Sequence, residues 1–215
     1  MLPHYQFTLA TALILIPAIG ALGVFVYPEE SKIGRFNVGV APLALLVALV
    51  EIAVWILAVK RFDFALPNGV QMSQHHAWYK DLGAAYDVGF TAAGLWLTGL
   101  AVVVMAAAIA YAYWSGRERT NAYYGLMLLL TAAIVGVFVA QDLLLFYAFF
   151  EAMLIPLYVL VGVWGGAGRL RATLKFVVYT MVGSLLMLAA ILVYGVGQGT
   201  FSMVDLAASH PSNST

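Results

Sequence analysis

Six stretches of about 20 mostly apolar residues dominate the sequence, and each is long enough to cross a bilayer as a helix. Hydrophobic residues make up 64% of the chain and charged residues only 9%, whereas a soluble domain has about 25% charged residues. A soluble globular fold is therefore excluded. The sequence predicts an all-α, polytopic membrane protein with six transmembrane helices, at residues 7–27, 38–59, 90–113, 122–140, 143–164 and 173–196.

The joints between these spans carry charge, glycine or proline, and the longest joint, residues 60–89, is expected to be a loop. Only Gln141-Asp142 separates the fourth and fifth spans, which predicts a tight helical hairpin. We expect residues 1–197 to form a six-helix transmembrane bundle. Residues 198–215 are expected to be a polar tail or an unfinished loop.

Lysine and arginine are distributed unequally between the two ends of the predicted bundle, and such an excess marks the cytoplasmic side. One end carries only Lys60, Arg61 and Lys80. The other end carries Lys32, Arg35, Arg117, Arg119, Arg169, Arg171 and Lys175. The second end is therefore predicted to face the cytoplasm or the mitochondrial matrix, which places both termini on the outer side.

Charge and cysteine content exclude several classes of function. The chain has 10 Lys+Arg and 10 Asp+Glu, so its charge gives no reason to expect nucleic-acid binding. It has no cysteine, which excludes disulfides and Cys-ligated zinc or iron–sulfur centres. His75 and His76 are adjacent, which makes them poor joint metal ligands, and a surface loop is expected there.

Glu151 is the strongest candidate functional residue, because an ionisable side chain inside a span is costly and marks a functional site. It follows Asp142 by nine residues, which places it about 13 Å into the membrane, close to the midplane. A carboxyl group there can hold and release a proton, as a proton relay requires. Pro156 is expected to kink the helix, so that carbonyls near Glu151 face polar groups or water. The alternative is a neutral glutamate that hydrogen-bonds to a neighbouring helix.

Three further ionisable residues are weaker candidates. Glu51 lies two-thirds of the way through the second span, where it is closer to an interface and could be partly hydrated. Asp142 is expected to cap the fifth helix, and it is about half a turn out of phase with Glu151. Lys175 is expected to be a snorkelling anchor, and a relay role requires that it point into the bundle.

The fifth and sixth spans carry a specific pattern. Residues 140–158 read Ala-Gln-Asp-Leu-Leu-Leu-Phe-Tyr-Ala-Phe-Phe-Glu-Ala-Met-Leu-Ile-Pro-Leu-Tyr, and the segments 162–166, 175–180 and 183–187 continue the pattern. This sequence resembles the antiporter-like chain M of NADH–quinone oxidoreductase, which is subunit 4 of respiratory complex I. The resemblance is dense over roughly residues 120–195.

The resemblance implies a proton-channel module in the membrane arm of a redox-driven pump. Glu151 matches the family's buried glutamate on the fifth helix, Lys175 matches a lysine at the sixth helix, and Asp142 matches an aspartate before the fifth. The resemblance implies no cofactor in this chain; NADH, flavin, iron–sulfur clusters and quinone belong to partner subunits of the membrane and peripheral arms. The implied location is the bacterial plasma membrane, with the mitochondrial inner membrane as the alternative.

The sequence also departs from the family. Residues 90–94 lack the family's aspartate, and Glu51 matches no family position. The family continues through a lysine-bearing broken seventh helix and a mirror-image repeat, so we expect this chain to be a truncated or split product. Two alternatives stay open: the large subunit of a multisubunit Na⁺/H⁺ antiporter, or a structural remnant that packs in a membrane complex and transports nothing.

Overall fold

The computed structural model describes residues 8–27, 32–33, 36–37, 39–66, 69–79, 84–115 and 120–209. Within this part of the chain, six helices are long and apolar enough to cross a membrane. They are α1 (Leu9–Val26), α2 (Val40–Arg61), α3 (Ala92–Ser115), α4 (Thr120–Val139), α5 (Leu143–Trp164) and α6 (Arg169–Gln198). The predicted fold class of six transmembrane helices is confirmed.

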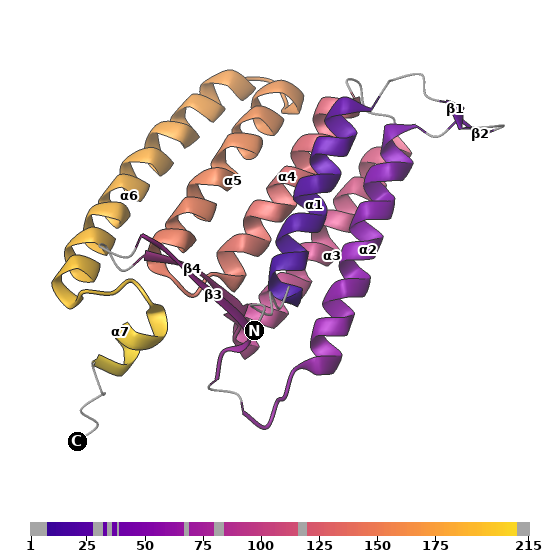
Figure 1. The fold of residues 1–215 in the computed structure, drawn as a ribbon. Coiled ribbons are helices and arrows are strands. Elements are labelled where there is room, and N and C mark those ends of the chain that lie inside the picture. Colours follow the sequence, from indigo (N-terminus) through magenta and orange to yellow (C-terminus); the bar gives the residue numbers. More distant parts are fainter. Residues whose placement is uncertain are drawn as a thin grey trace.

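Helices α1 to α4 pack together as a bundle, α5 packs against α4, and α6 packs against α5 at the outer edge (Figure 1). The core of this bundle consists of two clusters of buried apolar side chains, and a third, smaller cluster surrounds Phe201. One cluster includes Val24 of α1 and Ile109 of α3, and the other includes Leu13 of α1 and Val135 of α4. A short antiparallel strand pair, β1 (Lys32–Ile33) and β2 (Phe36–Asn37), connects α1 to α2.

Glycine allows close approach at two of the helix contacts. A Cβ atom on Gly99 of α3 would lie 2.2 Å from the ring of Trp55, and one on Gly136 of α4 would lie 2.3 Å from the ring of Phe149. Small residues at such positions let membrane helices pack closely where no hydrophobic effect drives them together. An aromatic ring of α2 therefore rests on the backbone of α3, and one of α5 rests on the backbone of α4.

Between α2 and α3 the chain forms an antiparallel hairpin of β3 (Gln71–Tyr79) and β4 (Ala84–Phe90), where the sequence predicted a loop. The hairpin lies across the end of the bundle at which α1 begins and α6 ends (Figure 1). Thr11 Oγ1 of α1 donates a hydrogen bond to Gln74 Oε1 over 2.7 Å and lies 3.2 Å from the Tyr86 hydroxyl. A segment that lies on other elements must satisfy its backbone groups, and strand pairing does so.

The segment after α6 is also more ordered than the predicted polar tail. Helix α6 ends at Gln198, and the next residue, Gly199, has a φ of 71°, the left-handed conformation that glycine adopts readily. Phe201 is then fully buried, and a short helix, α7 (Met203–Ser209), follows. The apolar Phe201 side chain anchors this segment against the ends of α5 and α6.

Candidate functional site

Glu151 lies on α5, eight residues after Leu143, which is about 12 Å along the helix. Its side chain is half-buried, and its Oε1 atom is buried without a hydrogen-bond partner among the described residues. Tyr147, one turn earlier on α5, lies beside Glu151, and Ser184 of α6 lies close to the Tyr147 side chain. The Tyr147 side chain therefore lies between Glu151 and the neighbouring helix.

A groove of about 450 Å³ lies between α5 and α6, and Glu151 forms part of its wall. Most of the groove is apolar, and Tyr158 and Thr180 add hydroxyl groups to it. The Thr180 hydroxyl donates to the Phe176 carbonyl over 2.8 Å. The full lining is Ala148, Glu151, Ala152, Leu154, Ile155, Tyr158, Leu174, Val177, Thr180 and Met181. The groove therefore contains a carboxyl group with one unused acceptor atom.

Pro156 lies inside α5, and the helix continues through it from Leu143 to Trp164. Because proline has no N–H, the carbonyl of Ala152 receives no hydrogen bond from the following turn of the helix. Ala152 follows Glu151 directly and lines the same groove. Proline therefore frees a backbone acceptor next to the carboxyl group.

Lys175 does not share the groove with Glu151. It is exposed in the second turn of α6, and it is not one of the residues that line the groove, although Leu174 and Val177 of the same helix are. Since α5 and α6 are joined by a short turn and run in opposite directions, helix rise places Lys175 about 10 Å closer than Glu151 to that turn. In the described part of the chain no ion pair joins the two residues.

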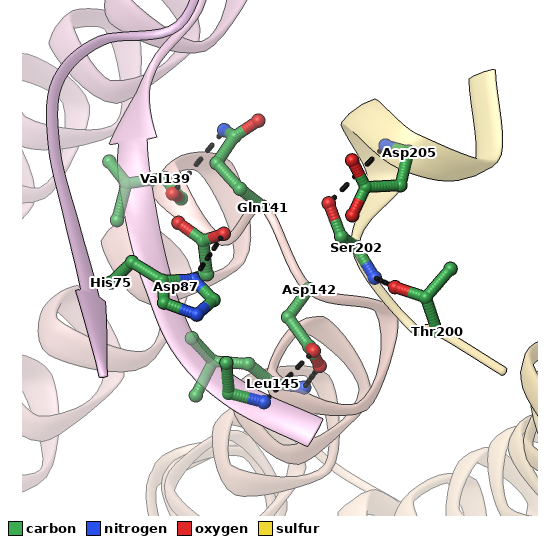
Figure 2. Close-up of polar contacts among 10 residues, drawn as sticks. His75, Asp87, Val139, Gln141, Asp142, Leu145, Thr200, Ser202 and Asp205 are labelled. Atoms are coloured by element: carbon green, nitrogen blue, oxygen red, sulfur yellow. Dashed lines mark hydrogen bonds and ion pairs between the residues drawn. The ribbon is translucent and has the colours of Figure 1, made fainter. Parts of the chain in front are cut away.

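Asp142 occupies the start of α5 and is 1% exposed (Figure 2). Its Oδ1 atom accepts hydrogen bonds from the backbone N–H groups of Leu144 and Leu145, over 2.9 and 3.0 Å. Its Oδ2 atom accepts from the N–H of Ala85 in the hairpin, over 3.2 Å. The predicted helix cap is confirmed, and the same carboxylate also fastens β4 to α5.

Gln141 extends this junction, and sequence reasoning did not identify it as important. Its backbone N–H donates to the Asp87 carbonyl over 2.8 Å, and its carbonyl accepts from the N–H of Met203 over 2.8 Å. Its side-chain Nε2 donates to the Gly89 carbonyl over 3.1 Å. The hairpin, the α4–α5 connection and the segment before α7 therefore meet at Gln141 and Asp142. The sequence signal that could have indicated this junction is a pair of adjacent polar residues between two long apolar spans.

Glu51 is 1% exposed, so the expectation that it could be partly hydrated near an interface is wrong. The reason is that α2 runs from Val40 to Arg61, which places Glu51 at its midpoint, inside the bundle with α1, α3 and α4. Its Oε1 atom has no hydrogen-bond partner among the described residues.

His75 lies on β3, and its Nδ1 atom is 3.1 Å from Oδ2 of Asp87 on β4. This exposed pair spans the hairpin, where the sequence predicted a surface loop. No group of three or more histidine, aspartate, glutamate or cysteine side chains that could hold a metal is found in the ranges that the structure describes.

The three residues of the predicted relay are thus held in different surroundings. Asp142 is engaged with backbone donors, Glu151 lies in the groove and Lys175 lies outside it. Tyr147 and Ser184, which contact one another beside Glu151, were not predicted. Tyr147 precedes Glu151 by one helical turn and could have been found from that spacing. Ser184 could not, because its place depends on how α6 lies against α5.

The chain is similar in sequence to known proteins over most of its length. Residues 140–214 match the family model described as NADH:quinone oxidoreductase/Mrp antiporter, transmembrane. NAD(P)H-quinone oxidoreductase chain 4 of Gloeobacter violaceus is 35% identical over 209 residues, which cover 95% of this chain and 38% of the relative. The chain therefore spans well under half the length of this relative.

Solved structures agree with the sequence comparison. A chain of respiratory complex I from Thermus thermophilus with bound NADH has a TM-score of 0.76 and 28% identity, covering 93% of this chain and 39% of that one. A chain of the Mrp complex from Dietzia has a TM-score of 0.69 and 19% identity, covering 94% and 20%, and shares the fold alone. The resemblance to antiporter-like subunit 4 of NADH–quinone oxidoreductase is thus confirmed, and residues 140–214 match the transmembrane model of the NADH:quinone oxidoreductase/Mrp antiporter family.

Proposed function

We propose that this chain is the part of a proton-translocating membrane-arm subunit in which Glu151 acts as an intramembrane proton relay. The observation that carries the proposal is the Glu151 carboxyl group, which lies about 12 Å along α5 with one buried, unpartnered oxygen in the wall of a groove. The Tyr147 hydroxyl beside it can act as a hydrogen-bond donor or as an acceptor, so it can interact with either the ionised or the protonated carboxyl group. A titratable group with both features can take up a proton and pass it on.

The parent complex would be an NADH–quinone oxidoreductase, as the name and identity of the sequence relative support. Its flavin, iron–sulfur clusters and quinone would lie in partner subunits, and redox chemistry there would shift charge near Glu151. The bacterial plasma membrane is the proposed location. We infer from the Lys and Arg distribution that the end of the bundle with the β3–β4 hairpin faces outward, because Arg169 and Arg171 lie at the opposite end.

The test replaces Glu151 with Gln in native membranes and follows electron-donor oxidation by quinone together with vesicle acidification. Gln keeps the shape and hydrogen bonding of the side chain but cannot titrate. We expect acidification to fall at least about tenfold, since a positioned proton-transfer group contributes about 10²–10⁴-fold. Glu151→Asp is the matched control, because it can still titrate and should retain part of the flux.

Assembly of the complex must be unchanged for this result to count, and it is checked by native gel. If the Gln variant assembles and both activities stay at wild-type levels, the relay is wrong and a non-transporting structural role is the better explanation. Lys175→Gln and Asp142→Asn, measured in the same way, test the other two members of the predicted relay.

The second candidate is a Na⁺/H⁺ antiporter subunit, because the matching family model includes the Mrp antiporters. This alternative predicts that an imposed Na⁺ gradient drives proton movement in vesicles without an electron donor. The proposed function predicts that acidification requires the donor and proceeds without added Na⁺. The same vesicles therefore separate the two candidates.

A further inference from the structure

A second carboxyl group inside the membrane region has no part in the proposed relay. Glu51 lies at the midpoint of α2, is 1% exposed, and has an Oε1 atom without a partner among the described residues. Thr98 of α3 is 0% exposed, and its hydroxyl oxygen also has no partner in that part of the chain. Two polar groups in one apolar core with unused hydrogen-bonding capacity need an explanation, because most buried polar groups are paired.

The packing of α2 on α3 places these two groups at a similar level. Trp55, one turn after Glu51, donates its indole N–H to the Leu95 carbonyl over 2.9 Å, and its ring rests on Gly99. Thr98 lies between these two contact points in the sequence of α3. Glu51 is therefore within about one helical turn, ~6 Å, of Thr98 along the bundle axis.

No charged or titratable group of α1, α3 or α4, the described helices that pack against α2, lies at that level to pair with Glu51. Helix α1 has none between Leu9 and Val26. The titratable residues of α3 and α4 are tyrosines close to the helix ends, namely Tyr111, Tyr113, Tyr123 and Tyr124. Lys60 and Arg61 are in the last turn of α2, about 13 Å or more from Glu51 along the helix. Glu51 is thus an isolated carboxyl group among apolar side chains.

An unpaired carboxylate in such a core costs several kcal/mol, and binding a proton removes that cost. If the group served packing alone, an apolar side chain of similar volume would be the better choice, because Glu51 leaves an acceptor unsatisfied. We propose that Glu51 is a second proton-binding site of this chain, separate from Glu151, whose carboxyl group holds an exchangeable proton in the interior of the α1–α4 bundle. Thr98 supplies a buried hydroxyl at about the same level of the bundle.

The test labels the wild-type chain in native membranes with a hydrophobic carbodiimide, which reacts within the bilayer with protonated carboxyl groups. Peptide mass spectrometry then identifies the modified residues. We expect Glu51 to be labelled, and its labelling rate to fall about tenfold per pH unit above its titration midpoint, as for any single acid. Glu51→Gln removes this label, and it also removes a protonated-carboxyl band from the infrared spectrum.

The labelling of Glu51 does not depend on whether Glu151 is a proton relay, so the two proposals can fail independently. In the Glu151→Gln variant the labelling of Glu51 should be unchanged, whether or not that variant still transports protons. The proposal is overturned if Glu51 gives neither the label nor the infrared band, or if its labelling is the same at every pH, which indicates a permanently protonated structural acid. It is also overturned if Na⁺ at constant pH blocks the labelling, which indicates a sodium site.

Discussion

Replacing Asp142 with Ala tests whether this residue stabilises the junction of β4 and α5 or takes part in proton transfer. Its carboxylate accepts three backbone hydrogen bonds, from Ala85, Leu144 and Leu145, and is 1% exposed. Loss of the helix cap costs about 0.5–2 kcal/mol, and a buried N–H left without an acceptor at Ala85 costs about 1–3 kcal/mol. The Ala variant should therefore destabilise the junction of hairpin and α5 by about 1.5–5 kcal/mol.

Asp142→Asn is the matched control for this experiment. Asn retains one carbonyl oxygen, which can still accept from Leu144 and Leu145 at the start of α5. Its amide N–H₂ group cannot accept from Ala85, so the Asn variant should lose the hairpin contact alone. The two variants therefore separate the cap from the contact with β4.

The assay is hydrogen–deuterium exchange of the assembled complex, read on peptides from β4 and from the first turn of α5. The Ala variant should exchange faster in both peptides, by about 30-fold for each ~2 kcal/mol, and the Asn variant should do so in β4 alone. If the Ala variant has the hydrogen–deuterium exchange rates of the wild type while proton transport falls, Asp142 acts through its proton. The structural role proposed for it would then be wrong.

Two further predictions concern packing and surface charge. Gly99→Ala should destabilise the contact of α2 and α3 by about 1–3 kcal/mol, because its Cβ atom would lie 2.2 Å from the Trp55 ring; Gly183→Ala, with no atom within 4 Å, is the control. Tryptophan fluorescence during thermal unfolding measures both, and equal midpoints would contradict the packing. His75→Ala should change stability by less than about 1 kcal/mol, since the His75–Asp87 pair is exposed. A larger loss in the same thermal assay would show that the pair holds the hairpin in place.

The six helices were predictable because a bilayer requires about 20 apolar residues, a requirement that each span meets on its own. The Asp142 cap was predictable for a similar reason, since helix ends have local rules. The β3–β4 hairpin was not predictable, because its strands pack against the end of the bundle. The contact of Thr11 with Gln74, for example, joins residues 63 positions apart in the sequence. Ser184 was missed for the same reason, because only the packing of α6 on α5 brings it to Tyr147.

Glu51 and Glu151 each have one carboxyl oxygen without a hydrogen-bond partner among the described residues. They differ in exposure, because Glu151 lines a groove and Glu51 is buried inside the bundle, and this difference determines how the two could work together. Helix α4 packs against both α2 and α5 and thus lies between the two sites. It carries no charged residue, and the buried hydroxyl of Thr131 donates to the Met127 carbonyl of the same helix over 2.8 Å. Helix α4 therefore places no charged side chain between the two sites. If both carboxyl groups exchange protons, Glu151 does so through the α5–α6 groove and Glu51 through the interior of the bundle, so blocking one should leave the titration of the other unchanged.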